Sequence, residues 1–392
     1  MKNISVPILF LYLLLINTLE SQISYKNFQS SVLDDERKLK VQLPRGYDDD
    51  EEKKKTYPLI LVLDGDYMFE SVAGNVDLFS YWDDMPKSIV VGINQIETRD
   101  EDCLFSKDNS LPFESGEDFF VFISTELIPH LKEEYRISDF KIIIGHGKTA
   151  NFINYFLLKD TPIFQGYIAI SPELAPNMME YIPNALGKKF PLKTYYYLSN
   201  TSSDISLIRR KSSELNNAIS SMASMNSESL GFKFNRFNEI SFYLSPTYAI
   251  PDALNYIFKP YQPISLNEYE NDILTSLYPP VTYLKKKYES ILKTYGIEKE
   301  ILLNDFKAIS AAIEKNQSFN DYEELSKMAK KSFSKTILPF YFLGRFYEET
   351  GKPKKAMHVY KSSYRAENLE NFNITKDTLF DRAEKIKADF GY

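Results

Sequence analysis

The sequence predicts an α/β fold with a doubly wound, mainly parallel sheet, followed by an all-α region. Short apolar runs bounded by turn residues recur through the first two thirds of the 392 residues, and segments with helical spacing separate them. Strands that alternate with helices in this way pair in parallel, with helices on both faces of the sheet. From residue 279 onward the strand-like runs stop, and amphipathic helical spacing takes their place.

Five of the apolar runs are interpreted as buried strands, at residues 58–63, 88–91, 141–144, 166–170 and 194–198. Helical spacing predicts helices over residues 119–135 and 151–158. The charged run at 48–55 predicts a solvated loop, because charges at this density are not buried without partners. Together these elements place the sheet domain at residues 24–262.

Residues 1–21 have the pattern of a removable export signal. Lys2 precedes an apolar run of about 13 residues at 4–16, and polar residues ending at Ser21 follow it. That run is shorter than the roughly 20 residues that cross a bilayer as a helix, and no later stretch approaches it. We therefore expect export to the periplasm or cell surface and no transmembrane helix in the mature chain; an uncleaved anchor helix is the alternative.

Residues 263–280 are expected to link the sheet domain to a helical region at 281–392. In that region, the small and large residues of one tetratricopeptide repeat occur at the expected spacing: Phe340, Leu343, Gly344, Tyr347, Ala356 and Tyr360. Helical repeats present extended concave surfaces to peptides and proteins. The expected partner is therefore another envelope or secreted protein, bound through this region.

Composition argues against several classes of function. There are 47 Lys and Arg against 54 Asp and Glu, and the resulting net charge of −7 argues against a nucleic-acid partner. One cysteine, Cys103, cannot form an intramolecular disulfide, and three histidines are too few for a His-rich metal centre. We expect neither a metal nor a cofactor, and we expect the Cys103 thiol to be inert because acidic neighbours raise its pKa.

Seven blocks of the sheet domain follow one another in the order found in a known family. They lie at residues 30–47, 57–66, 85–99, 126–137, 142–150, 164–174 and 250–258. In these blocks the chain resembles the esterase family of α/β-hydrolases that includes esterase D and ferri-enterobactin esterase. The resemblance implies an α/β-hydrolase fold and hydrolysis of carboxylic esters by a serine on a strained strand-to-helix turn, within the motif G-x-S-x-G.

The chain departs from this motif at the serine. Gly145 matches the first glycine, but Gly147 stands at the serine position, and Thr149 and Ala150 stand at the glycine positions that crowd against the turn. Lys148 follows the turn. Glycine tolerates a strained backbone at least as well as serine does, so we expect the turn to be kept without its attacking oxygen.

The resemblance places a catalytic histidine before residue 250, but residues 238–250 contain none. His130 is expected on a solvent-facing helix, His146 precedes the turn, and His358 belongs to the helical repeat. A hydroxyl nucleophile needs a base to accept its proton. The resemblance also places a carboxylate after residue 198, and Asp204 is the candidate remnant of it.

The oxyanion hole of such enzymes consists mainly of backbone N–H groups. The resemblance assigns these donors to Lys148 and to the turn that contains Asp64, Gly65 and Asp66. We expect these residues to form a pocket for an anion or a carbonyl group without chemistry, and vestigial packing is the alternative.

The first functional hypothesis is therefore a non-catalytic binding or assembly protein of the cell envelope. An active ester hydrolase with a non-standard arrangement is the second hypothesis, in which Lys148, Thr149 or Ser171 would take over the chemistry. The third is a carrier for a small ester or carboxylate held in the retained pocket.

Overall fold

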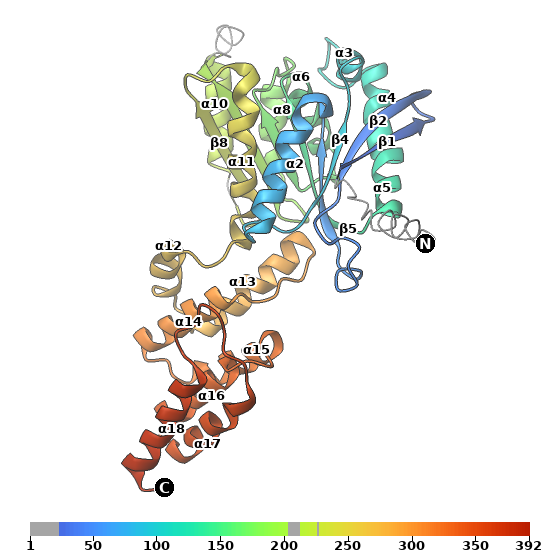
Figure 1. Cartoon of the computed structure of the whole chain (residues 1–392). Helices are drawn as coiled ribbons and strands as arrows, with labels where there is room; N and C mark the ends of the chain where they lie inside the picture. The colour runs from blue at the N-terminus through green and yellow to red at the C-terminus, as the bar shows by residue number, and fades with distance from the viewer. Residues whose placement is uncertain (1–22, 203–211, 226) are drawn as a thin grey trace, which may run out of the picture. The chain divides into compact units, whose positions relative to one another are not determined.

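The computed structural model describes residues 23–202, 212–225 and 227–392, and these form two compact units (Figure 1). The sheet unit comprises residues 23–78, Lys87–Ile137 and the described part of Lys141–Pro251. The helical unit comprises Phe79–Pro86, Ser138–Phe140 and Asp252–Tyr392. The expected export signal at 1–21 and the candidate acid Asp204 lie outside the described residues.

Eight strands of the described chain form one sheet, in the order β1-β2-β4-β3-β5-β6-β7-β8. The strands are β1 (Ile23–Ser30), β2 (Asp35–Gln42), β3 (Tyr57–Val62), β4 (Ile89–Ile93), β5 (Ile137–His146), β6 (Gly166–Ile170), β7 (Thr194–Thr201) and β8 (Leu230–Phe237). Strands β3 to β8 pair in parallel, whereas β1 and β2 are antiparallel. The mainly parallel sheet predicted from the apolar runs is confirmed.

The central strands consist almost entirely of buried aliphatic residues, which explains their continuous apolar runs. In the register of β3 with its neighbours, Ile60 lies opposite Val90 of β4 and opposite Ile142 of β5. The carboxyl ends of these parallel strands therefore reach one edge of the sheet, where ligands bind in open α/β folds.

The helices that lie wholly or partly in the sheet unit cover both faces of the sheet. They are α2 (Gly65–Tyr81), α3 (Arg99–Asp102), α4 (Ser115–Val121), α5 (Ile128–Glu134), α6 (Lys148–Phe152), α7 (Asn154–Leu157), α8 (Met178–Leu186), α10 (Ser212–Ala223) and α11 (Ser245–Phe258), with the π-helix η2 (Phe122–Leu127) and the 3-10 helix η4 (Phe242–Leu244). Helix α2 packs on the face that Gly92 presents, where a Cβ would meet the Phe69 ring. Residues of α4, α6, α8 and α10 share one core with the opposite face.

Two predicted helices differ from the structure in detail. The segment 119–135 is helical as far as Glu134 but passes through η2, so the hydrogen-bond pattern widens in its middle. The segment 151–158 forms α6 and α7, and α6 begins earlier, at Lys148, directly after Gly147. The helix therefore starts at the turn itself, which places its first backbone N–H groups beside the position of Gly147.

The helical unit contains several amphipathic helices in succession. They are α12 (Leu266–Glu268), α13 (Pro280–Tyr295), α14 (Leu303–Asn316), α15 (Asp321–Ser332), α16 (Leu338–Glu349), α17 (Pro353–Ser362) and α18 (Lys376–Phe390), with the short turns η5 (Lys259–Tyr261), η6 (Tyr269–Ile273) and η7 (Ser363–Arg365). The segment 263–280 contains α12 and η6, and its Ile264 and Ile273 are buried in the core of this unit. No helix of the described chain is both long and apolar enough to cross a membrane.

Helices α16 and α17 approach each other closely at one glycine. A Cβ on Gly344 would lie inside the Tyr360 ring, and both Tyr360 and Ala356 are fully buried. The Tyr360 hydroxyl donates a hydrogen bond to Glu348 Oε2 at 2.8 Å, which satisfies the polar end of this buried ring. The small residue at 344 thus sets the distance between the two helices.

We predict that Gly344→Ala destabilises the helical unit by about 1–3 kcal/mol, because the added methyl overpacks against Tyr360. Hydrogen exchange of the α16 and α17 amides measures this loss. The matched control is Gly74→Ala in α2, where a Cβ meets nothing within 4 Å; helix propensity predicts no loss of protection there. Unchanged exchange in Gly344→Ala would contradict the close packing.

Candidate functional site: a pocket beside a glycine at the strand-to-helix turn

Gly147 forms the sharp turn between β5 and α6. Its backbone has φ 62° and ψ −114°, a conformation that side-chain-bearing residues adopt only under strain. The Gly147 N–H donates to the Ile170 carbonyl at 3.0 Å, and the Gly147 carbonyl accepts from the Glu173 N–H at 3.0 Å. A Cβ on Gly145 would lie 2.5 Å from the Thr149 backbone, so the chain also needs glycine there. The turn predicted from the motif is therefore present.

Three side chains surround the place where a serine at 147 would project. A Cβ on Gly147 would lie 2.9 Å from Phe242 Cζ, 3.2 Å from Glu173 Oε1 and 3.4 Å from Arg99 Nη2. Phe242 belongs to the segment where the resemblance expected a histidine, and its ring occupies this space instead. A serine could enter only if the Phe242 ring moved.

Buried Asp64 holds this turn against the sheet. Arg99 Nε donates to Asp64 Oδ1 at 2.6 Å, and Arg99 Nη2 donates to Asp64 Oδ2 at 3.1 Å and to the His146 carbonyl at 2.7 Å. The Thr149 hydroxyl donates to Asp64 Oδ2 at 2.6 Å and accepts from the His146 N–H at 2.8 Å. Thr149, at a glycine position of the motif, thus ties the start of α6 to this carboxylate.

Asp64 stabilises the positive charge of Arg99. Burial disfavours the charged guanidinium, but the hydrogen bonds and the negative charge of Asp64 outweigh this effect and raise the pKa of Arg99. The neighbouring Tyr67 hydroxyl lies 3.1 Å from Asp64 Oδ2 and 2.9 Å from His146 Nδ1, and its one proton can be donated to only one of them. Burial together with the Asp64 charge raises the pKa of that phenol. Arg99 therefore carries its positive charge at the site throughout the ordinary pH range.

His146 is buried beneath the turn, with 1% of its surface exposed. Its Nδ1 lies 2.9 Å from the Tyr67 hydroxyl, and its ring packs on Phe242 with the centroids 4.2 Å apart. Its Nε2 lies 3.1 Å from the Phe242 carbonyl, an oxygen that can only accept a hydrogen bond. This geometry favours a proton on Nε2, which leaves that nitrogen unable to act as a base.

Two hydroxyl groups connect His146 to the pocket. Ser171 donates to Ser245 Oγ at 3.3 Å, and Ser245 Oγ lies 3.4 Å from His146 Nε2. Ser245 donates its own proton to the Phe242 carbonyl at 2.7 Å, a much shorter contact. Sequence reasoning named Ser171 but missed Ser245, because nothing in the chain order places residue 245 beside residues 146 and 171.

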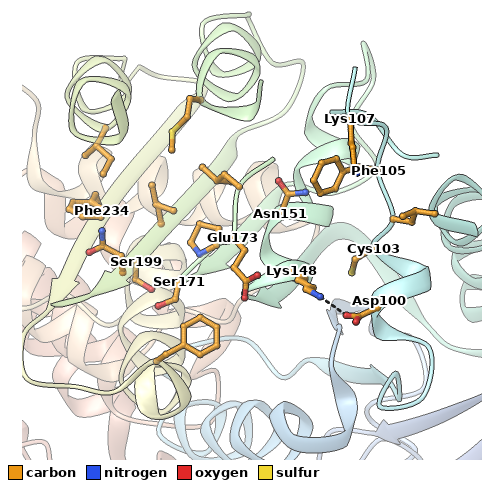
Figure 2. A pocket seen from close by; sticks show the side chains of 18 residues that line it. Asp100, Cys103, Phe105, Lys107, Lys148, Asn151, Ser171, Glu173, Ser199 and Phe234 are labelled. Carbon is orange, nitrogen blue, oxygen red and sulfur yellow. Dashed lines mark hydrogen bonds and ion pairs between the residues drawn. The ribbon is translucent and has the colours of Figure 1, made fainter. Parts of the chain in front are cut away.

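A pocket of about 630 Å³ opens beside the turn, at the carboxyl ends of the strands. Its apolar wall includes Leu104, Phe105, Leu174, Met179, Leu198, Ile219, Phe234 and Phe242, and its polar lining includes Asp100, Lys107, Lys148, Asn151, Ser171, Glu173, Ser199 and Asn200. Figure 2 shows Glu173, Ser171 and Lys148 at the centre of this site, with Lys107 beside Phe105. An apolar cavity with a few convergent polar groups is typical of a small-molecule site.

Only one of the four predicted oxyanion residues, Lys148, lines the pocket. Lys148 lines the pocket, and its Nζ pairs with Asp100 Oδ1 at 2.6 Å (Figure 2). Asp64, Gly65 and Asp66 are not among the described residues that line it. Asp66 Oδ2 instead accepts from the Gln95 and Ile96 N–H groups, at 2.6 and 2.9 Å.

Of the two other candidate residues, Cys103 lies in the pocket lining and His130 does not. Cys103 lines the pocket, and burial first and the charges of Asp64 and Asp102 second raise the pKa of its thiol. Burial, rather than the acidic neighbours alone, keeps this thiol protonated. His130 is on α5 and contacts Glu134 at 3.1 Å, away from the pocket lining.

The sheet order, the strand-to-helix turn and the pocket beside it define an α/β-hydrolase fold. Residues 30–221 match the family described as "Putative esterase", and the sheet unit of this chain is related to that esterase family. No curated protein matches the chain in sequence.

Solved structures agree with this relationship. An uncharacterised protein from Capnocytophaga ochracea is similar at 29% identity and a TM-score of 0.83, over 94% of this chain and 100% of that one. An IroE-like serine hydrolase from Shewanella oneidensis is similar at 18% identity and a TM-score of 0.57, over 78% and 98%. The BES protein from Bacillus cereus is similar at 21% identity and a TM-score of 0.51, over 60% and 95%. The last two likenesses show the fold alone.

We predict that Asp64→Ala costs the sheet unit about 1–3 kcal/mol, because it leaves half-buried Arg99 and the buried Thr149 hydroxyl without the carboxylate to which they donate. Hydrogen exchange of the β5 amides measures the loss. The control is Asp100→Ala, which removes the exposed partner of Lys148 and should cost less than about 1 kcal/mol. Equal effects of the two variants would show that the Asp64 pair does not hold the turn.

Proposed function

We propose that this protein is a non-catalytic relative of the esterases that binds a small ligand in the pocket of its sheet unit. One observation carries the proposal: the space for a nucleophile at residue 147 is closed by Phe242 and Glu173, while a pocket of about 630 Å³ remains open beside it. The site therefore offers a cavity for recognition without an attacking oxygen at the turn.

The surrounding groups support binding rather than chemistry. Nucleophilic catalysis needs a hydroxyl and a base in contact, and the base must be free to accept a proton. His146 is the imidazole nearest to Gly147, but its Nε2 faces the Phe242 carbonyl. Loss of either serine or histidine from a catalytic triad removes most of its power, by a factor of about 10⁶ in subtilisin.

A second candidate function, ester hydrolysis by a relocated hydroxyl, is favoured by the chain from Ser171 through Ser245 to His146. In that arrangement Ser171 would attack, and its proton would pass through Ser245 to the imidazole. The contacts of 3.3 and 3.4 Å are long, and Ser245 already donates to the Phe242 carbonyl. The chain would have to rearrange before any proton could move.

We further propose that the protein works in the cell envelope and that its helical unit binds another protein. The leader pattern at residues 1–21 supports export, and the repeat-like pair α16 and α17 supports protein binding. The close approach of Gly344 to Tyr360, two residues at tetratricopeptide positions, supports this proposal.

Short-chain aryl esters separate the two candidate functions. We expect the purified wild-type protein to hydrolyse them no faster than a heat-denatured control, and Ser171→Ala to change nothing. Turnover by the wild type that Ser171→Ala abolishes would establish the second candidate and refute the first.

We expect Gly147→Ser alone to restore no ester hydrolysis and to destabilise the sheet unit by about 1–3 kcal/mol, because a side chain is strained at this φ and meets Phe242. Gly147→Ser with Phe242→His removes the obstructing ring and supplies an imidazole near the new hydroxyl. We expect weak turnover from the double variant only, measured with the same aryl esters. Turnover by the single variant would mean that a working base is already present.

A further inference from the structure

We infer that the pocket selects a ligand with a protonated amine, whose ammonium group lies against Glu173 and whose apolar body lies along the opposite wall. The inference rests on the proposed binding function and names the class of ligand. It departs from the anion or carbonyl pocket expected from the sequence, because the charge nearest to Gly147 that has no partner is negative.

Some acidic residues around the pocket form an ion pair with a basic side chain, and one does not. Asp64 is paired with Arg99 at 2.6 Å, and Asp100 is paired with Lys148 at 2.6 Å. Glu173 also lines the pocket, and within the described chain no basic side chain forms an ion pair with it. The pocket thus presents one exposed, uncompensated carboxylate beside the turn.

The edge of an aromatic ring lies beside that carboxylate. Glu173 Oε1 is 3.2 Å and Phe242 Cζ is 2.9 Å from the same point above Gly147, so the tip of the ring is close to the carboxylate. The carboxylate attracts an ammonium group and repels an anion, and the ring edge offers an apolar contact to the carbon atoms next to the nitrogen. Arg99 Nη2 is 3.4 Å from that point, but its N–H groups are directed to Asp64 and to the His146 carbonyl.

The remaining lining specifies the rest of the ligand. Leu174, Met179, Ile219 and Phe234 form an apolar wall that suits an aliphatic or aromatic body. Ser199 is also among the lining residues; it is fully buried, and its hydroxyl has no hydrogen-bond partner in the described chain. A buried hydroxyl without a partner is costly, so a polar atom on the ligand body would find a ready partner there.

Two lysines line the pocket, and Lys107 is the one that forms no ion pair within the described residues. Its charge lies too far from the turn to neutralise Glu173. Figure 2 shows Lys107 beside Phe105, away from Glu173. A negatively charged group on the ligand would therefore be tolerated only at that distant rim. Lys148, which lies closer to Glu173, has its charge balanced by Asp100.

Calorimetry on the full-length protein with three probes of equal length tests this inference: octylammonium, octanoate and 1-octanol at pH 7. We expect octylammonium to bind at least about tenfold more tightly than octanoate, since a charge-assisted hydrogen bond to Glu173 replaces a repulsion. Glu173→Gln should weaken octylammonium about tenfold and leave 1-octanol unchanged. The matched control, Glu180→Gln, changes an exposed acid of α8 outside the pocket lining and should alter neither.

The outcomes separate this inference from the function on which it rests. If octanoate or 1-octanol binds as tightly as octylammonium, or Glu173→Gln leaves octylammonium binding intact, the pocket is a ligand site but the amine preference is wrong. If none of the three probes binds, the proposed binding function fails as well.

Discussion

The contact on which the site depends is the ion pair between buried Asp64 and half-buried Arg99. Because Asp64 is only 1% exposed, its charge must be compensated within the protein, and Arg99 supplies two hydrogen bonds for this purpose. Arg99 also reaches the His146 carbonyl, and Thr149 reaches Asp64, so one carboxylate connects β5, the turn and α6. The turn keeps its strained geometry because the surrounding groups fix it from several directions.

Preservation of that geometry explains how the pocket persists with glycine at the serine position of the motif. The turn needs a backbone conformation that glycine adopts at low cost, and Gly147 meets this need. The space released by the missing side chain is filled by the Phe242 ring and the Glu173 carboxylate, which changes the character of the site. A region that stabilises developing negative charge in esterases thereby acquires a fixed negative charge in this protein.

Much of the fold follows from the sequence, because parallel strands buried on both faces leave continuous apolar runs such as residues 58–63 and 166–170. The glycine at the turn was also predictable, since Gly145 and Gly147 lie at fixed distances from a strand. Phe242 and Glu173 were not, because their positions over the turn depend on loops far apart in sequence. Lys148 was placed at the right point of the chain, but its pairing with Asp100 required tertiary structure.

The central claim is that no hydroxyl in the pocket is activated as a nucleophile. Its most direct test is the intact mass of the folded wild-type protein after exposure to a fluorophosphonate, which reacts with activated serines. We expect no adduct beyond that seen with heat-denatured protein, because His146 Nε2 faces the Phe242 carbonyl. A stoichiometric adduct on Ser171 or Ser245 that forms only in the folded protein would contradict it.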